Sequence, residues 1–140
     1  MSKVAVVYWS GTGNTEAMAK VVETGAKEKG AEVSLMTAAD FNASMVESFD
    51  AIAFGCPSMG TEELEEDEFA PMFEGCREKL KEKKIALFGS YGWGDGEWMQ
   101  NWEDTCKKDG AVFACAPVTC NEEPDDEAVA VCKELGAALV

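Results

Sequence analysis

The chain alternates short apolar runs with longer amphipathic segments, and this alternation restricts its fold more than any other feature. The amphipathic segments predict helices at residues 16–29, 69–81, 97–108 and 124–140. The apolar runs predict five strands, at residues 3–9, 32–36, 51–54, 85–88 and 112–115, the last with a continuation at 118–120. Strands that alternate with helices form parallel sheets with right-handed crossovers. We therefore expect one α/β domain over residues 1–140, with a doubly wound five-stranded parallel sheet and helices on both faces.

Apolar side chains recur at helical spacing in each predicted helix, which identifies the faces that turn toward the sheet. Gly30 and Gly110 follow the first and third helices as stop signals. Pro124 suits an early position of the last helix. The inner face of that last helix is expected to carry Val131, Cys132, Leu135 and Leu139.

The net charge and the histidine and cysteine content narrow the range of possible functions. A net charge of −15 argues against nucleic acid and against anionic membranes, and it favours basic protein partners. The chain has no histidine, which excludes histidine catalysis and histidine metal ligands. Its six cysteines form no Cys-x-x-Cys pair, so we expect buried free thiols and no metal centre.

The sequence shows neither a membrane segment nor a leader. No apolar run approaches the roughly 20 residues of a membrane helix. The first residues lead directly into a strand, without the pattern of a signal peptide. We therefore expect a cytoplasmic protein, and its charge and size favour a monomer.

The loop after the first strand has the composition of an anion site. Its residues are Ser10, Gly11, Thr12, Gly13, Asn14 and Thr15. Two glycines let the backbone turn its N–H groups inward, and the following helix adds free donors and partial positive charge. The loop lacks the Gly-Lys-Ser/Thr of a P-loop, and Glu16 replaces the third glycine of a dinucleotide fingerprint. The alternative is an ordinary polar turn with a helix cap.

Two further loops follow the third and fourth strands, and parallel strands end at one edge of their sheet. One loop places Met59 beside Gly60, and the other places Trp93 between Gly92 and Gly94. Taken alone, Met59 is more simply interpreted as a core residue, and Trp93 as a side chain that folds back onto the domain. Together with the first loop they predict a mononucleotide, its phosphate in the first loop and its planar ring between Met59 and Trp93.

These three loops resemble those of flavodoxins. The matching stretches are residues 8–16 (YWSGTGNTE), 56–62 (CPSMGTE) and 89–96 (GSYGWGDG), and the resemblance covers essentially the whole chain. It implies the flavodoxin-like strand order 2-1-3-4-5 and a non-covalently bound FMN. The cofactor-binding residues implied by the resemblance are Ser10, Gly11, Thr12, Gly13, Asn14, Thr15, Ser58, Met59, Gly60, Thr61, Glu62, Ser90, Tyr91, Gly92, Trp93, Gly94 and Asn121.

The resemblance also assigns individual roles. Glu62 matches the acceptor for the flavin N3–H, and Asn121 matches a contact on the loop after strand five. Gly60 matches the glycine whose carbonyl is exposed by a peptide flip and accepts a hydrogen bond from the N5–H of the neutral semiquinone. Thr61 and Pro57 stand at positions that vary in the family, where they would tune affinity and potential.

The implied function is low-potential one-electron transfer, mainly between semiquinone and hydroquinone, without substrate turnover of its own. The partners would be redox proteins with basic docking faces, such as reductases and ferredoxin-dependent enzymes. The alternative is a small NAD(P)H-dependent flavin or quinone reductase, which would need a second nucleotide site. A further alternative is a phosphoacceptor signalling domain. It would need acidic residues at the ends of strands one and three, but these strands end in Trp9-Ser10 and Gly55-Cys56.

Overall fold

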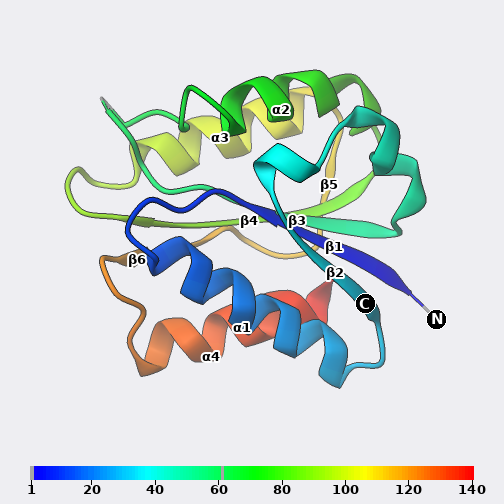
Figure 1. Cartoon of the computed structure of the whole chain (residues 1–140), viewed down its shortest axis with the longest axis horizontal. Coiled ribbons are helices and arrows are strands. Elements are labelled where there is room, and N and C mark those ends of the chain that lie inside the picture. Colours follow the sequence, from blue (N-terminus) through cyan, green and yellow to red (C-terminus); the bar gives the residue numbers. More distant parts are fainter. Residues whose placement is uncertain (1, 61) are drawn as a thin grey trace.

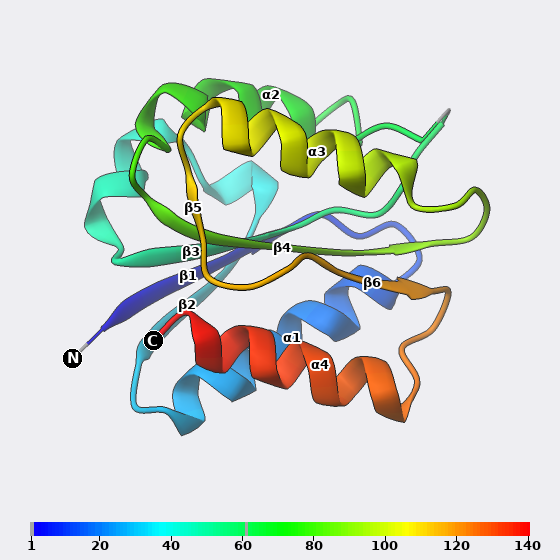
Figure 2. The same cartoon turned by 180° about the vertical axis from the view of Figure 1, so that it is seen from behind.

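The computed structural model describes residues 2–60 and 62–140. A parallel sheet lies between two helical layers, with α2 and α3 on one face and α1 and α4 on the other (Figures 1 and 2). The strands are β1 (Lys3–Tyr8), β2 (Glu32–Thr37), β3 (Ala51–Gly55), β4 (Lys84–Tyr91), β5 (Val112–Phe113) and β6 (Val118–Asn121). Their order is β2-β1-β3-β4-β5, with β6 also paired to β4. This confirms the expected fold class and the order 2-1-3-4-5.

The α-helices are α1 (Asn14–Glu28), α2 (Phe69–Cys76), α3 (Glu97–Lys108) and α4 (Asp126–Ala138). The third helix has the predicted bounds. The second is shorter than predicted, because its last turn tightens into the 3-10 helix η3 (Arg77–Lys79). Two more 3-10 helices, η1 (Ala38–Asp40) and η2 (Ala43–Ser48), occupy the polar connection after β2. No α-helix in the described part of the chain is long and apolar enough to cross a membrane.

The start of α4 differs from the prediction. Pro124 lies outside the helix, and Asp125 is its N-cap, with a side-chain oxygen that accepts a hydrogen bond from Ala128 N at 2.8 Å. An aspartate side chain can accept the otherwise unpaired N–H of the first turn, which a proline cannot do. The helix therefore begins two residues after the proline.

The fourth and fifth strands also differ from the prediction. β4 continues to Tyr91, so residues 89–91 are strand and not loop. The extension is held by β6, whose register pairs Phe88 with Val118 and Tyr91 with Asn121. The predicted continuation of the fifth strand is confirmed as β6, whereas β5 ends two residues earlier than predicted; the two segments pair with different ends of β4.

The core consists of two apolar clusters, one on each face of the sheet. β1 and β3 contribute to both, because alternate side chains of a central strand enter opposite layers. On α4, Cys132, Leu135 and Leu139 are buried as predicted, whereas Val131 is 37% exposed. That prediction was wrong because Val131 is rotated about 100° from Cys132 and leaves the buried stripe.

Candidate functional site

Three loops meet at the carboxyl edge of the sheet and enclose a cleft of about 620 Å³. They follow β1, β3 and β4 and lie together at the left of Figure 1. Backbone bonds hold the strand ends in register, from Trp9 N to Gly55 O at 3.0 Å and from Cys56 N to Phe88 O at 3.1 Å. The cleft is lined by Trp9, Gly11, Thr12, Asn14, Pro57, Ser58, Met59, Ser90, Tyr91, Gly92, Trp93, Glu122 and Glu123.

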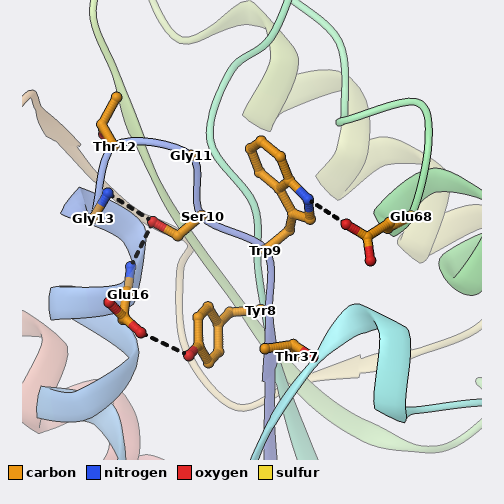
Figure 3. Close-up of a pocket in the computed structure, with 9 residues that line it drawn as sticks. All are labelled: Tyr8, Trp9, Ser10, Gly11, Thr12, Gly13, Glu16, Thr37 and Glu68. Carbon is orange, nitrogen blue, oxygen red and sulfur yellow. Dashed lines mark hydrogen bonds between the residues drawn. The ribbon is translucent and has the colours of Figure 1, made fainter.

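The first loop is braced by its own serine. Ser10 Oγ accepts hydrogen bonds from Gly13 N at 3.1 Å and Glu16 N at 3.2 Å (Figure 3). Gly13 has a φ of +97°, the left-handed conformation that glycine adopts without strain. Within residues 2–60 and 62–140, the backbone N–H groups of Thr12, Asn14 and Thr15 have no hydrogen-bond acceptor. Unpaired donors at a helix N-terminus are suited to binding an anion.

Thr15 connects this loop to β4. Its side chain is only 1% exposed, its Oγ1 lies 2.8 Å from Ser90 Oγ, and it accepts a bond from Ser90 N at 3.3 Å. Thr15 does not line the cleft, nor does it line a second hollow that lies beside the first loop. The structure thus places Thr15 behind the loop as a cross-link, with Ser90 at the cleft wall.

The middle loop is a tight turn. Met59 N and Glu63 N each donate to the other residue's carbonyl at 2.8 Å, and Gly60 has a φ of +53° between them. Thr61 lies outside the described residues. Ser58 N donates to Ser90 O at 3.0 Å, while Ser58 Oγ is buried and has no hydrogen-bond partner in the described chain. A buried hydroxyl without a partner, at the wall of a cleft, fits a polar ligand group.

The third loop holds an aromatic side chain in solvent. Trp93 is 57% exposed at the mouth of the cleft, so it does not fold back onto the domain. Tyr91 lies further in and packs on Trp98 with ring centroids 5.5 Å apart. Trp98 is fixed in turn by its Nε1, which donates to the carbonyl of Cys56 at 3.2 Å. The wall behind Trp93 is therefore rigid.

Glu62 lies between the middle and third loops rather than at the cleft wall. Its Oε1 accepts a hydrogen bond from Glu97 N at 3.1 Å, at the start of α3. The same carboxylate lies so close to Gly94 that a Cβ there would come within 2.5 Å of Oε1. Glu62 has a φ of +55°, which is unusual for a residue with a side chain. The structure brings Glu62 to Gly94 but does not place it among the lining residues.

The loop after β6 closes the far side of the cleft. Asn121 ends β6 opposite Tyr91 and lines a separate hollow beside α4. The next two residues, Glu122 and Glu123, line the cleft instead, and Glu122 N donates to Tyr91 O at 2.8 Å. The sequence prediction did not include these acids, nor Pro57 and Trp9. Trp9 and Pro57 both lie in the stretches that resemble flavodoxins, and Pro57 was expected to tune affinity and potential.

A second hollow of about 450 Å³ lies beside the first loop (Figure 3). Tyr8 Oη donates to Glu16 Oε2 at 3.1 Å, and Trp9 Nε1 donates to Glu68 Oε1 at 3.2 Å. Burial, together with the Glu16 carboxylate, raises the pKa of Tyr8 above its ordinary value. Neither this hollow nor the cleft is lined by a lysine or arginine. Each is lined by two glutamates, Glu16 and Glu68 in this hollow and Glu122 and Glu123 in the cleft.

The donor set of the cleft suits FMN. Unpaired N–H groups in the first loop and the orphaned Ser58 hydroxyl can bind the phosphate without a cationic side chain. Trp93, Tyr91 and Met59 provide apolar and aromatic surface for a planar ring. Fold and cleft together define a doubly wound α/β protein with a mononucleotide site at its carboxyl edge.

Comparison with known proteins identifies the family. The sequence model described as Flavodoxin matches residues 6–135. A flavodoxin of Megasphaera elsdenii is 49% identical over 135 residues, and one of Clostridium beijerinckii is 45% identical over 134 residues, each alignment covering 96% of both chains. The solution structure of two-electron reduced M. elsdenii flavodoxin superposes with a TM-score of 0.89 at 48% identity, covering 97% of both chains. The chain belongs to the flavodoxin family, and its cofactor is FMN.

Proposed function

We propose that this protein is a low-potential one-electron carrier that holds FMN in the cleft and has no substrate turnover of its own. The family supports the role of an FMN-binding electron carrier. The observation that carries the proposal is a single cleft that combines unpaired N–H donors of the first loop with the exposed Trp93. Such a cleft would hold the phosphate at the first loop and leave the ring near solvent beside Trp93, where another protein can exchange electrons with it.

The proposed site uses the predicted residues with three changes of role: Ser58 joins the phosphate contacts, and Gly13 and Thr15, whose N–H and hydroxyl are bonded to Ser10 and Ser90, leave them. The phosphate lies against Ser10, Thr12, Asn14 and Ser58, and the ring lies between Met59 and Trp93. Thr15, Gly11 and Gly13 shape the phosphate loop, while Ser90, Tyr91, Gly92 and Gly94 form the wall behind the ring. Thr61, Glu62 and Asn121 remain proposed ring contacts, with Glu62 already held near the third loop by Glu97 N.

FMN, when bound, supplies one-electron exchange between its oxidised, half-reduced and fully reduced forms, and the protein selects among these by what it places nearby. We propose that the carbonyl of Gly60 would accept a hydrogen bond from the N–H that the ring gains at N5. Gly60 already has a positive φ, and a Cβ at this position would meet no described atom within 4 Å. Glycine leaves the peptide after Gly60 free to turn.

The acidic surroundings favour a low second potential. Glu122 and Glu123 line the cleft, no lysine or arginine does, and Glu62 lies behind Gly94. Adding negative charge to the ring in such surroundings is unfavourable. A one-electron couple shifts by about 59 mV for each tenfold change in the equilibrium. We therefore propose that the carrier works mainly between the half-reduced and fully reduced forms.

The same charge selects the partners. We propose redox proteins with basic docking faces, such as reductases and ferredoxin-dependent enzymes, which a protein of net charge −15 would attract over a distance. Nucleic acid and membrane surfaces are not proposed as partners. We place the protein in the cytoplasm as a monomer. Electron transfer to such a partner should slow steeply as salt rises, and a flat salt profile would contradict steering.

Stepwise anaerobic reduction of the purified, FMN-loaded protein, followed by its absorption spectrum, tests the proposal. We expect a yellow protein to pass through a blue form with long-wavelength absorption before it bleaches. Direct two-electron bleaching with steady consumption of NADH or NADPH would favour the alternative, a small flavin or quinone reductase. A flavin-free chain that does not quench added FMN would reject the site.

A further inference from the structure

The indole of Trp9 is held in one orientation where the cleft and the second hollow meet. Trp9 lines both spaces. The outer edge of its six-membered ring lies close to Gly11, where a Cβ would come 3.0 Å from Cη2 and 3.2 Å from Cζ3. Its Nε1 donates to Glu68 Oε1 at 3.2 Å (Figure 3). The ring is thus fixed between the phosphate loop and the chain that precedes α2.

Glu68 is itself well placed to orient another side chain. The buried carboxylate of Glu65 accepts hydrogen bonds from Glu68 N and Phe69 N at Oε1 and from Asp67 N at Oε2, each at 2.8 Å. The backbone that carries Glu68 therefore cannot shift without breaking a buried network. Glu68 lines the second hollow and not the cleft, and a carboxylate would repel a phosphate held by the first loop, so Glu68 is not itself a ligand of the cofactor.

We infer that Glu68 is a positioning residue for the flavin cleft, and that it acts through Trp9. The hydrogen bond holds the indole as the wall of the cleft beside the phosphate loop. Without it, the ring gains other rotamers, and binding FMN must then order the ring again, which weakens affinity. The inference rests on the proposed placement of FMN in the cleft.

Charge and hydrogen bonding make opposite predictions for Glu68. A carboxylate beside an anion site disfavours phosphate, so removing it should tighten FMN binding if charge were its only effect. The hydrogen bond requires an acceptor oxygen but no charge. Glu68→Gln keeps the acceptor and removes the charge, whereas Glu68→Ala removes both.

The test is a titration of the full-length flavin-free chain with FMN, followed by quenching of flavin fluorescence. We expect Glu68→Ala to weaken binding by about three- to tenfold, as loss of one hydrogen bond would. Glu68→Gln should bind like the parent chain or more tightly. Trp9→Phe, which removes the donor, should weaken binding, and adding Glu68→Ala to it should cause no further loss.

The matched control is Glu66→Ala, which removes an exposed acid that lines neither the cleft nor the second hollow. It should leave affinity unchanged or slightly higher. The urea midpoints of the flavin-free variants check that the fold persists. Tighter binding by Glu68→Ala, or a full additional loss in the Trp9→Phe background, would overturn the inference. If the flavin site itself were wrongly placed, Trp93→Ala and Ser58→Ala would leave FMN affinity unchanged in the same titration.

Discussion

The side-chain oxygens of Thr15 and Ser90 lie 2.8 Å apart in the protein interior, although 75 residues separate them in the chain. Thr15 belongs to the first turn of α1 and Ser90 to the end of β4. Their bond fixes the phosphate loop against the strand that carries the aromatic loop. Two walls of the proposed FMN site are thereby held together.

Breaking this pair should destabilise the protein. Thr15→Val leaves the Ser90 hydroxyl and the Ser90 N–H without their buried partner, and we expect the free energy of unfolding to fall by about 1–3 kcal/mol. The double variant Thr15→Val with Ser90→Ala should lose less than the sum of the single losses. Urea denaturation of the flavin-free proteins measures both. Strict additivity would mean that the two hydroxyls do not interact.

Ser58 should show opposite effects on stability and on binding. Its buried hydroxyl has no partner in the described chain, so Ser58→Ala should leave the flavin-free protein as stable as the parent, or up to about 1 kcal/mol more stable. The same change should weaken FMN binding by about tenfold, because it removes a proposed phosphate donor. The exposed Ser48→Ala serves as the control and should alter neither quantity. A large loss of stability in Ser58→Ala would show that the hydroxyl already has a partner without flavin.

Two glycines allow α1 and α4 to pack closely. A Cβ at Gly25 would lie 2.1 Å from the carbonyl oxygen of Lys133, and one at Gly136 would lie 2.1 Å from that of Val22. We expect Gly25→Ala to lower the free energy of unfolding by about 1–3 kcal/mol, because both backbones are rigid. Gly75→Ala in α2, where a Cβ meets no described atom within 4 Å, should instead raise it by about 0.5–1 kcal/mol. Thermal or urea unfolding measures this difference in sign.

The buried carboxylate of Glu65 should make stability depend on acid pH. Burial alone would raise the pKa of this 5% exposed side chain, but its bonds from Phe69 N, Glu68 N and Asp67 N outweigh burial and lower the pKa below its ordinary value. Because the folded pKa is the lower one, the stabilisation is complete above the unfolded value of about 4.3 and is lost as the pH falls through the folded pKa.

The variant Glu65→Gln tests this dependence. Its amide would turn an NH₂ group toward Asp67 N, so we expect the free energy of unfolding to fall by about 1–3 kcal/mol at pH 7. The difference in the free energy of unfolding between the variant and the parent should shrink as the pH falls below about 4. Glu66→Gln, at the exposed neighbouring position, is the control. A difference that stays constant with pH would show that the carboxylate charge contributes nothing.

Much of the fold was predictable because it depends on local patterns. The apolar runs of β1 and β3 and the four-residue spacing of Trp98, Trp102 and Cys106 in α3 are visible within a few residues of sequence. The extent of β4 was not, because residues 89–91 become strand only through pairing with β6. Val131 has the same apolar character as its buried neighbours, and only the packing of α4 on α1 determines that it faces solvent.

The site divides in the same way. The sequence by itself determined the residue types of the three loops and the edge at which they meet, because glycines, hydroxyl groups and strand order act through the local backbone. Only the tertiary structure decided that Thr15 bonds to Ser90, that Glu62 accepts from Glu97 N, and that Trp9 is held by Glu68. These pairs join segments 35 to 75 residues apart, and their partners are selected by distance in the folded chain, a quantity that no local pattern contains.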